Sequence, residues 1–169
     1  MNILNIHGYA GSPQNAAYAA ILANGYKNII SPVIDYDAES PEDILYRLRY
    51  IIADKKIGLI IGTSLGGFFA LALSAELNLP VILVNPFLMP FLTFPEYIKS
   101  YVSIFGTLSQ IDSANVSCIV GENDEVISDY QFTKDLLENS RFRSIPNGKH
   151  SGFTLPLKDF FGEILQYYI

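Results

Sequence analysis

The fold of this chain is decided by residues 59–70, which read LIIGTSLGGFFA. The apolar start predicts a buried β-strand, the Gly-x-Ser-x-Gly sequence at 62–66 predicts a sharp turn, and the residues that follow predict a helix. Small residues two positions before and two after Ser64 let the strand and the helix approach, and the turn raises the serine hydroxyl at the helix N-terminus. This arrangement is typical of a nucleophile elbow, although a glycine-rich turn without chemistry also fits the motif. We therefore take Ser64 as the candidate nucleophile.

Short apolar runs alternate along the chain with longer amphipathic runs, and they predict strands and helices in turn. The expected strands are Asn2–Ile6, 29–34, 57–61, Val81–Val84, 116–120 and 142–145, and the expected helices are 13–24, Pro41–Asp54, Leu65–Leu77, 128–139 and 155–168. Ser12 before Pro13 and Ser40 before Pro41 are each expected to be an N-cap followed by the first helical residue. The alternation predicts an α/β fold with about six parallel strands, right-handed crossovers and helices on both faces of the sheet.

The length and composition are those of a single domain over residues 1–169, with a core that needs neither disulfides nor a metal. Acidic residues outnumber basic ones, 17 to 11, for a net charge of −6, and the basic residues form no run. Nucleic acid and anionic membrane surfaces are therefore not expected as partners. No basic residue precedes Lys27, and asparagine and proline interrupt the most apolar long stretch, 80–95, so we expect neither a signal peptide nor a membrane helix. These features predict a cytoplasmic protein.

The cysteines, histidines and glycine motifs exclude most cofactor chemistry. Cys118 is the single cysteine and lies in an apolar run, where it is expected to be a buried small hydrophobic residue. One cysteine and two distant histidines make no convincing transition-metal site. The chain also contains neither a P-loop nor a G-x-G-x-x-G dinucleotide motif. We therefore expect no metal and no cofactor.

A serine nucleophile needs a base, and the chain has two histidines. His7 ends the first expected strand, and His150 follows the last one. In hydrolases with this elbow the order along the chain is nucleophile, acid, histidine, so His150 is the candidate base. His7 lies where such enzymes place a backbone loop, and we expect it to form structural hydrogen bonds.

The acid is expected in a loop before the histidine strand. Residues 118–127, CIVGENDEVI, place three carboxylates there, and we take Asp124 as the acid that orients His150. Glu122 and Glu125 are expected to be solvated charges of the same loop.

Backbone N–H groups are expected to form the oxyanion hole. One belongs to Leu65, directly after the nucleophile. The other comes from the loop after the first strand, where Tyr9 is the first choice and Ala10 the second. Gly8 and Gly11 would let this backbone lie close to a reacting carbonyl.

The segment 86–115 interrupts the alternation and is rich in aromatic residues. Its aromatic rings are expected either to pack a helix onto the sheet or to line a pocket, and both can hold for different faces. Phe87 and Phe91, just past the fourth strand, are the candidate wall for a substrate acyl group. The segment is too short for a large lid, so we expect an open site that prefers short acyl chains.

Five sequence blocks together resemble a known family. They are LNIHGYAGSP at 4–13, GTSLGGFFA at 62–70, VNP at 84–86 with Pro90, GENDEV at 121–126 and KHSGF at 149–153. In this order they resemble the small bacterial YqiA-type esterases of the α/β-hydrolase superfamily. The resemblance implies a compact α/β-hydrolase with strand order 2-1-3-4-5-6, and Ser64, Asp124 and His150 match the family triad.

The sequence thus predicts a serine carboxylesterase that cleaves a small-molecule ester through an acyl-Ser64 intermediate. An acyl thioesterase is the alternative enzyme, since the same groups cleave thioesters. A non-catalytic binding module that keeps the fold is the alternative from another class. The sequence leaves the physiological substrate, the acyl chain length and the oligomeric state open.

Overall fold

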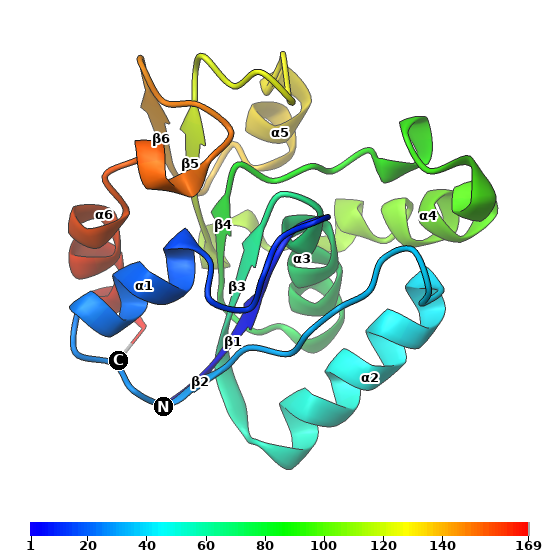
Figure 1. Cartoon of the computed structure of the whole chain (residues 1–169), viewed down its shortest axis with the longest axis horizontal. Helices are drawn as coiled ribbons and strands as arrows, with labels where there is room; N and C mark the ends of the chain where they lie inside the picture. The colour runs from blue at the N-terminus through cyan, green and yellow to red at the C-terminus, as the bar shows by residue number, and fades with distance from the viewer. Residues whose placement is uncertain (169) are drawn as a thin grey trace.

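A parallel β-sheet forms the centre of the molecule (Figure 1). The structure is a computed structural model that describes residues 1–168. The strands are β1 (Asn2–Ile6), β2 (Ile29–Ile30), β3 (Ile57–Thr63), β4 (Val81–Val84), β5 (Val116–Gly121) and β6 (Arg141–Ile145). All neighbouring strands pair in parallel, in the order β2-β1-β3-β4-β5-β6, which confirms the predicted fold class. The inner strands therefore all point their carboxyl ends to the same side of the sheet.

Helices cover both faces of the sheet (Figure 1). They are α1 (Ala16–Ala23), α2 (Pro41–Asp54), α3 (Leu65–Leu77), α4 (Ile98–Phe105), α5 (Gln131–Leu136) and α6 (Leu157–Ile164). Successive residues of a strand point to opposite faces, so Leu59 and Ile61 pack towards α1 and α6, whereas Ile60 packs towards α2 and α3. Within residues 1–168 no helix is both long and apolar enough to cross a membrane.

The segment 86–115 folds into α4 and short 3-10 turns between β4 and β5. Tyr101 of α4 is fully buried, and its ring lies 5.6 Å from that of Phe68 and 6.3 Å from that of Phe69, both on α3. The packing role expected for these aromatic rings therefore holds for Tyr101.

The strand predicted at 29–34 is shorter than expected, because only Ile29 and Ile30 pair with β1. Pro32 has no N–H to donate to a ladder. The N–H of Ile34 donates instead to the His7 ring.

The first helix begins at Ala16, so the prediction that Ser12 caps it is wrong. Asn15 is the N-cap, and its side chain accepts the N–H of Tyr18. In a helix capped by Ser12 the carbonyl of Pro13 would accept a helical N–H, but it instead accepts the Ser31 hydroxyl at 2.7 Å.

The last two expected helices are also shorter, at Gln131–Leu136 and Leu157–Ile164. Tyr130 turns towards Asp124 before α5 begins, and Pro156 is the N-cap of α6. The predicted N-cap at Ser40 is confirmed, since its side chain accepts the N–H of Asp43.

Strand β3, helix α3 and strand β1 meet at backbone contact around the elbow. A Cβ on Gly62 would lie 2.6 Å from the Cβ of Ala70, and a Cβ on Gly66 would overlap the carbonyl oxygens of Ile6 and His7. No side chain beyond hydrogen fits at either position without moving the sheet. This close approach fixes the start of α3 against the end of β1.

Replacing Gly66 with alanine should therefore destabilise the protein by about 3 kcal/mol or more, since overpacking against unyielding backbone lies at the upper end of measured costs. The control is Gly106→Ala, at a helical φ of −58° with 3.4 Å to the nearest atom, Ser103 O. Gly106→Ala should raise the free energy of unfolding by less than about 1 kcal/mol. Urea unfolding midpoints compare the two, and equal midpoints would contradict the prediction.

Candidate active site

Ser64 lies at the turn between β3 and α3 in a strained conformation, with φ 53° and ψ −122°. A non-glycine residue in this region costs on the order of 1–3 kcal/mol, so its surroundings must hold it there. Its N–H donates to the carbonyl of Val84, and its own carbonyl accepts the N–H of Phe87, each at 3.0 Å. The Ser64 hydroxyl does not cap α3. It is therefore available to another partner.

That partner is His150. The Ser64 Oγ lies 3.0 Å from His150 Nε2, and His150 Nδ1 lies 2.9 Å from Asp124 Oδ2. Because a carboxylate only accepts, Nδ1 carries the proton and Nε2 is left to accept the serine hydroxyl. The His150 side chain is 20% exposed and that of Asp124 is 1% exposed. The geometry therefore allows a proton to move from Ser64 to His150 while the carboxylate stays shielded.

Neutral donors surround the Asp124 carboxylate. Its Oδ1 accepts the N–H groups of Val126 at 2.8 Å and Ile127 at 2.7 Å, and its Oδ2 accepts the Tyr130 hydroxyl at 2.6 Å as well as His150 Nδ1–H. Burial by itself would raise the pKa of this carboxyl, but these hydrogen bonds outweigh burial and hold the pKa below its ordinary value. Asp124 therefore remains a carboxylate that can orient His150.

Sequence reasoning missed Tyr130, which carries no motif. Burial, followed by the hydrogen bond to Asp124, raises the pKa of its phenol far above the ordinary value, so it remains a donor. Glu122 and Glu125 are exposed as expected, but the carboxylate of Glu125 also accepts the His150 backbone N–H at 3.1 Å. The loop thus contacts both the side chain and the backbone of the histidine.

The loop after β1 forms a tight turn against the serine. The N–H of Gly11 donates to the carbonyl of Gly8, and a Cβ on Gly8 would lie 2.9 Å from the Cβ of Ser64. Among the described residues, the N–H groups of Tyr9 and Leu65 donate to no protein acceptor. The structure therefore leaves both predicted oxyanion donors without a protein acceptor, Leu65 directly after Ser64 and Tyr9 directly after Gly8, which contacts Ser64. Ala10, the second choice, occupies the left-handed region at φ 53°.

The His7 side chain forms hydrogen bonds to the backbone of this turn and of the chain after β2. Its Nδ1 donates to the carbonyl of Gly8 at 2.8 Å, and its Nε2 accepts the N–H of Ile34 at 3.0 Å. The ring is nearly fully buried. Both nitrogens are thus occupied in one neutral tautomer, which is the structural role expected for His7.

A cavity of about 200 Å³ lies between the chain after β4 and the loop that follows Asp124. Phe87, Leu92 and Val126 are among its lining residues. Phe91 does not line it, because the turn at Pro90–Leu92 directs the Phe91 ring to Phe105, with 5.1 Å between centroids. Leu92, and not Phe91, therefore faces this cavity.

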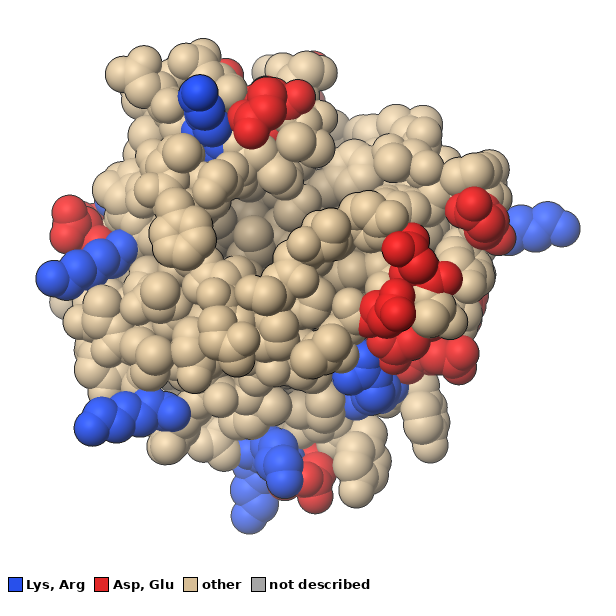
Figure 2. All heavy atoms as spheres, in the orientation of Figure 1, with Lys and Arg blue, Asp and Glu red and all other residues tan. Residues whose placement is uncertain are grey.

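Large apolar side chains are exposed on the loops that carry the candidate site residues. Tyr9, Leu92, Val126 and Phe153 are all exposed, Phe153 to 75%, and they come from the loops that carry the oxyanion turn, the cavity wall, the acid and the base. In Figure 2 the charged side chains lie around the periphery of the visible face, and the hollow near its middle is uncharged. This composition favours uncharged, apolar groups in a bound molecule.

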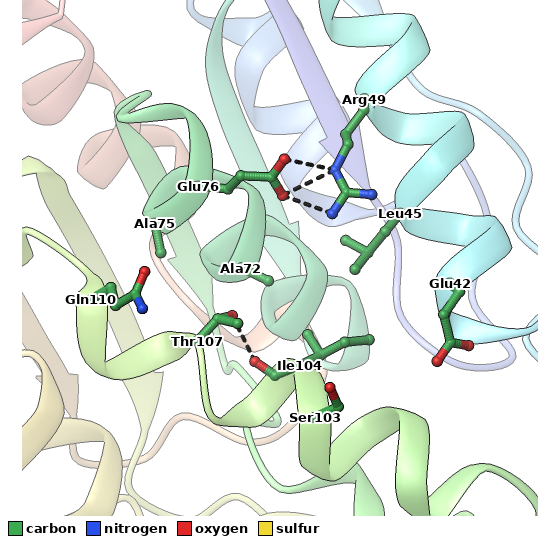
Figure 3. A pocket seen from close by; sticks show the side chains of 10 residues that line it. All are labelled: Glu42, Leu45, Arg49, Ala72, Ala75, Glu76, Ser103, Ile104, Thr107 and Gln110. Carbon is green, nitrogen blue, oxygen red and sulfur yellow. Dashed lines mark hydrogen bonds and ion pairs between the residues drawn. The ribbon is translucent and has the colours of Figure 1, made fainter.

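A larger cavity, of about 440 Å³, lies away from Ser64, between α2, α3 and α4 (Figure 3). Arg49 and Glu76 form an ion pair at 2.7 Å in its wall, and Ala72 is part of its apolar floor. At 1.5 Å per residue, Ala72 lies about 12 Å along the helix from Ser64. Cavity size therefore does not identify the reactive site, whereas the hydrogen-bonded groups do.

Neither Cys118 nor the acidic side chains of residues 1–168 form a second reactive cluster. Cys118 is fully buried in β5, and burial raises the pKa of its thiol. Among residues 1–168, no group of three or more His, Cys, Asp and Glu side chains is placed to hold a metal ion.

The strand order, the serine at the β3–α3 turn and the histidine after the last strand define the α/β-hydrolase fold. Residues 2–121 match the family described as "Uncharacterised protein family (UPF0227)", and the chain belongs to this family. This is the YqiA-type family that the sequence blocks resemble.

Solved structures show the same fold at low sequence identity. A structure described under "LipS and LipT, two metagenome-derived lipolytic enzymes" aligns with a TM-score of 0.69 and 14% identity, over 99% of this chain and 92% of the other. Est1E from Butyrivibrio proteoclasticus aligns with a TM-score of 0.69 and 17% identity, over 97% and 88%. An alpha-beta serine hydrolase homologue from Coxiella burnetii aligns with a TM-score of 0.65 and 16% identity, over 97% and 85%.

The lowered pKa of Asp124 predicts how the free energy of unfolding depends on pH. A carboxyl whose pKa is lower in the folded state contributes stability above its unfolded pKa, about 4, and this contribution is lost as the pH falls through the folded value. The unfolding free energy of the wild type should therefore exceed that of Asp124→Asn by a constant amount above about pH 5, and the gap should narrow in acid. Urea unfolding at a series of pH values measures the gap.

The control is Glu122→Gln, in the same loop and exposed, whose curve should overlay that of the wild type. A gap that stays constant or widens on acidification would show that Asp124 is not stabilised as a carboxylate.

Proposed function

We propose that this protein is a serine hydrolase that cleaves carboxylic esters. The observation that carries the proposal is the continuous hydrogen-bonded chain from Ser64 Oγ through His150 to Asp124, at 3.0 and 2.9 Å, beside two N–H groups without protein acceptors in the described chain. Structural neighbours that are described as lipolytic enzymes and as a serine hydrolase homologue support the same class of reaction.

In this proposal Ser64 Oγ attacks the ester carbonyl while His150 Nε2 takes its proton. The N–H groups of Leu65 and Tyr9 bind the oxyanion of the tetrahedral intermediate. His150 then gives the proton to the departing alcohol, which leaves an acyl group on Ser64. Water repeats the attack with His150 as base and releases the carboxylic acid. Asp124 stabilises the imidazolium form and does not itself take the proton.

The proposed substrates are uncharged esters with short acyl chains. The cavity lined by Phe87, whose backbone N–H donates to the Ser64 carbonyl, has a volume of about 200 Å³, which is smaller than the ~300–1,000 Å³ of sites that enclose drug-sized ligands. Apolar residues of the segment 86–115 wall this cavity on one side, and we propose that the segment is a short cover of the site within one hydrolase domain over 1–169. The same groups would cleave a thioester, so acyl-CoA esters belong in the substrate panel.

A fluorophosphonate probe tests the nucleophile directly. The wild type should be labelled covalently, and Ser64→Ala should fold normally, escape labelling and lose about 10³-fold or more in turnover of p-nitrophenyl acetate. His150→Ala should lose a similar factor, because Ser64 would have no base. His7→Ala, which disturbs only the turn, should lose about 10-fold, less than the cost of one oxyanion donor.

Wild-type turnover in the Ser64→Ala variant, or an inactive His7→Ala beside an active His150→Ala, would overturn the proposal. Hydrolysis of acyl-CoA but not of aryl esters would replace the esterase assignment with a thioesterase.

The cavity wall should control acyl chain length. Phe87→Ala should enlarge the cavity, so that p-nitrophenyl esters with longer acyl chains give the higher kcat/KM. The ratio of kcat/KM between neighbouring chain lengths should change by about 10-fold or more, the effect that one methylene group has in an apolar pocket. Phe91→Ala is the matched control, since it removes an aromatic ring of the same segment that packs on Phe105. It should leave the chain-length profile unchanged, and a profile shifted only by Phe91→Ala would exclude this cavity as the acyl site.

A further inference from the structure

Asn85 is a fully buried polar residue directly after β4, and its backbone occupies the left-handed region at φ 45°. Its amide nitrogen donates to two successive carbonyls, that of Lys149 at 2.9 Å and that of His150 at 2.8 Å. Its amide oxygen accepts the N–H of Gly121 at 2.8 Å. The side chain therefore joins the ends of β4 and β5 to the loop that carries His150.

The backbone on either side of Asn85 holds the serine. The carbonyl of Val84 accepts the N–H of Ser64, and the N–H of Phe87 donates to the carbonyl of Ser64, each at 3.0 Å. Residues 84–87 thus bind the candidate nucleophile by their backbone and the candidate base by a side chain. This is a short, rigid connection between two groups that are far apart in the sequence.

The other bonds to the His150 backbone are less shielded. The His150 N–H donates to Glu125, and the Lys149 N–H donates to the Thr154 hydroxyl, and both contacts are exposed. Water competes with exposed hydrogen bonds, whereas a buried amide that loses its partners leaves polar groups unsatisfied. The buried bonds of Asn85 are therefore the ones that define where the loop lies.

We propose that Asn85 is the positioning residue that holds His150 in register with Ser64. The inference rests on the proposed function. Asparagine fits the position because it supplies two N–H donors and one acceptor and tolerates a positive φ. The Asn85→Asp variant keeps the shape of the side chain but has no donor when the carboxyl is ionised. The Asn85→Gly variant keeps the backbone conformation and loses all three bonds.

The experiment compares both Asn85 variants with a matched control. Asn24 also donates its amide nitrogen to two carbonyls, those of Ala20 and Lys158, each at 2.9 Å, but it joins α1 to α6 away from the site. Asn85→Asp and Asn85→Gly should lower kcat for p-nitrophenyl acetate by about 10²-fold with little change in KM, the cost of a misplacement of about 1 Å. Asn24 is half-buried and its bond to Lys158 is exposed, so Asn24→Asp controls for the loss of a side-chain amide that joins two elements, and it should keep its kcat. All assays are run at a temperature well below the midpoint of thermal unfolding of each variant.

A second readout does not depend on turnover. A hydrogen bond to a buried carboxylate shifts the His150 Nδ1–H proton resonance far downfield and slows its exchange. This resonance should be present in the wild type and in Asn24→Asp, and broadened or lost in both Asn85 variants. A general structural role for Asn85 would lower the unfolding midpoint without moving either kcat or this resonance.

The outcomes separate the two proposals. If Ser64→Ala is inactive but both Asn85 variants keep wild-type kcat and the downfield resonance, the positioning role is wrong and the hydrolase assignment stands. If the wild type neither reacts with fluorophosphonate nor hydrolyses any ester, the hydrolase assignment fails, and the resonance alone decides the positioning role.

Discussion

The structure depends on one steric constraint, the contact of backbone with backbone where β3, α3 and β1 meet. Gly62 and Gly66 leave no room for a side chain, so α3 starts directly against the carbonyl groups that end β1. This contact sets the height of Ser64 above the sheet and brings the Gly8–Gly11 turn beside it. Once these are fixed, the parallel order of the strands delivers the loops after β5 and β6 to the same end of the sheet. The candidate site is thus a consequence of how closely the central elements pack.

Side-chain hydrogen bonds to backbone then hold each loop of the site. His7 supports the turn after β1, Asn85 joins β4 to the histidine loop, and Asp124 accepts two N–H groups of its own loop. The carboxylate is stabilised by N–H and O–H donors, with no lysine or arginine among its hydrogen-bond partners in the described chain. Such an arrangement keeps the surroundings of the carboxylate free of competing cations, and it is compatible with the exposed apolar side chains on the loops of the site.

Local sequence signals were sufficient for the helices Pro41–Asp54 and Leu65–Leu77 and for the loops that bring Ser64, Asp124 and His150 together, whereas the strand order followed from the resemblance to a family. Features set by non-local contacts were not predictable. The start of α1 depends on the Ser31 hydroxyl taking the Pro13 carbonyl, a contact made across the sheet edge. The hydrogen bond of Tyr130 to Asp124 follows from no motif, and the VNP block at 84–86 does not reveal what the Asn85 side chain bonds to. The 3-10 turn at Pro90–Leu92 places Leu92, and not Phe91, at the cavity wall.

The two edges of the sheet have a consequence for the behaviour of the protein in concentrated solution. An edge strand exposes unpaired backbone groups to which another chain can add a strand. Strand β2 is only two residues long, which is too short to template such pairing. Strand β6 carries two arginines, Arg141 stacked 4.6 Å from the Tyr167 ring and Arg143 paired with Glu163 at 2.6 Å. The shortness of β2 and the charged side chains of β6 thus each oppose aggregation by the addition of a strand from another chain.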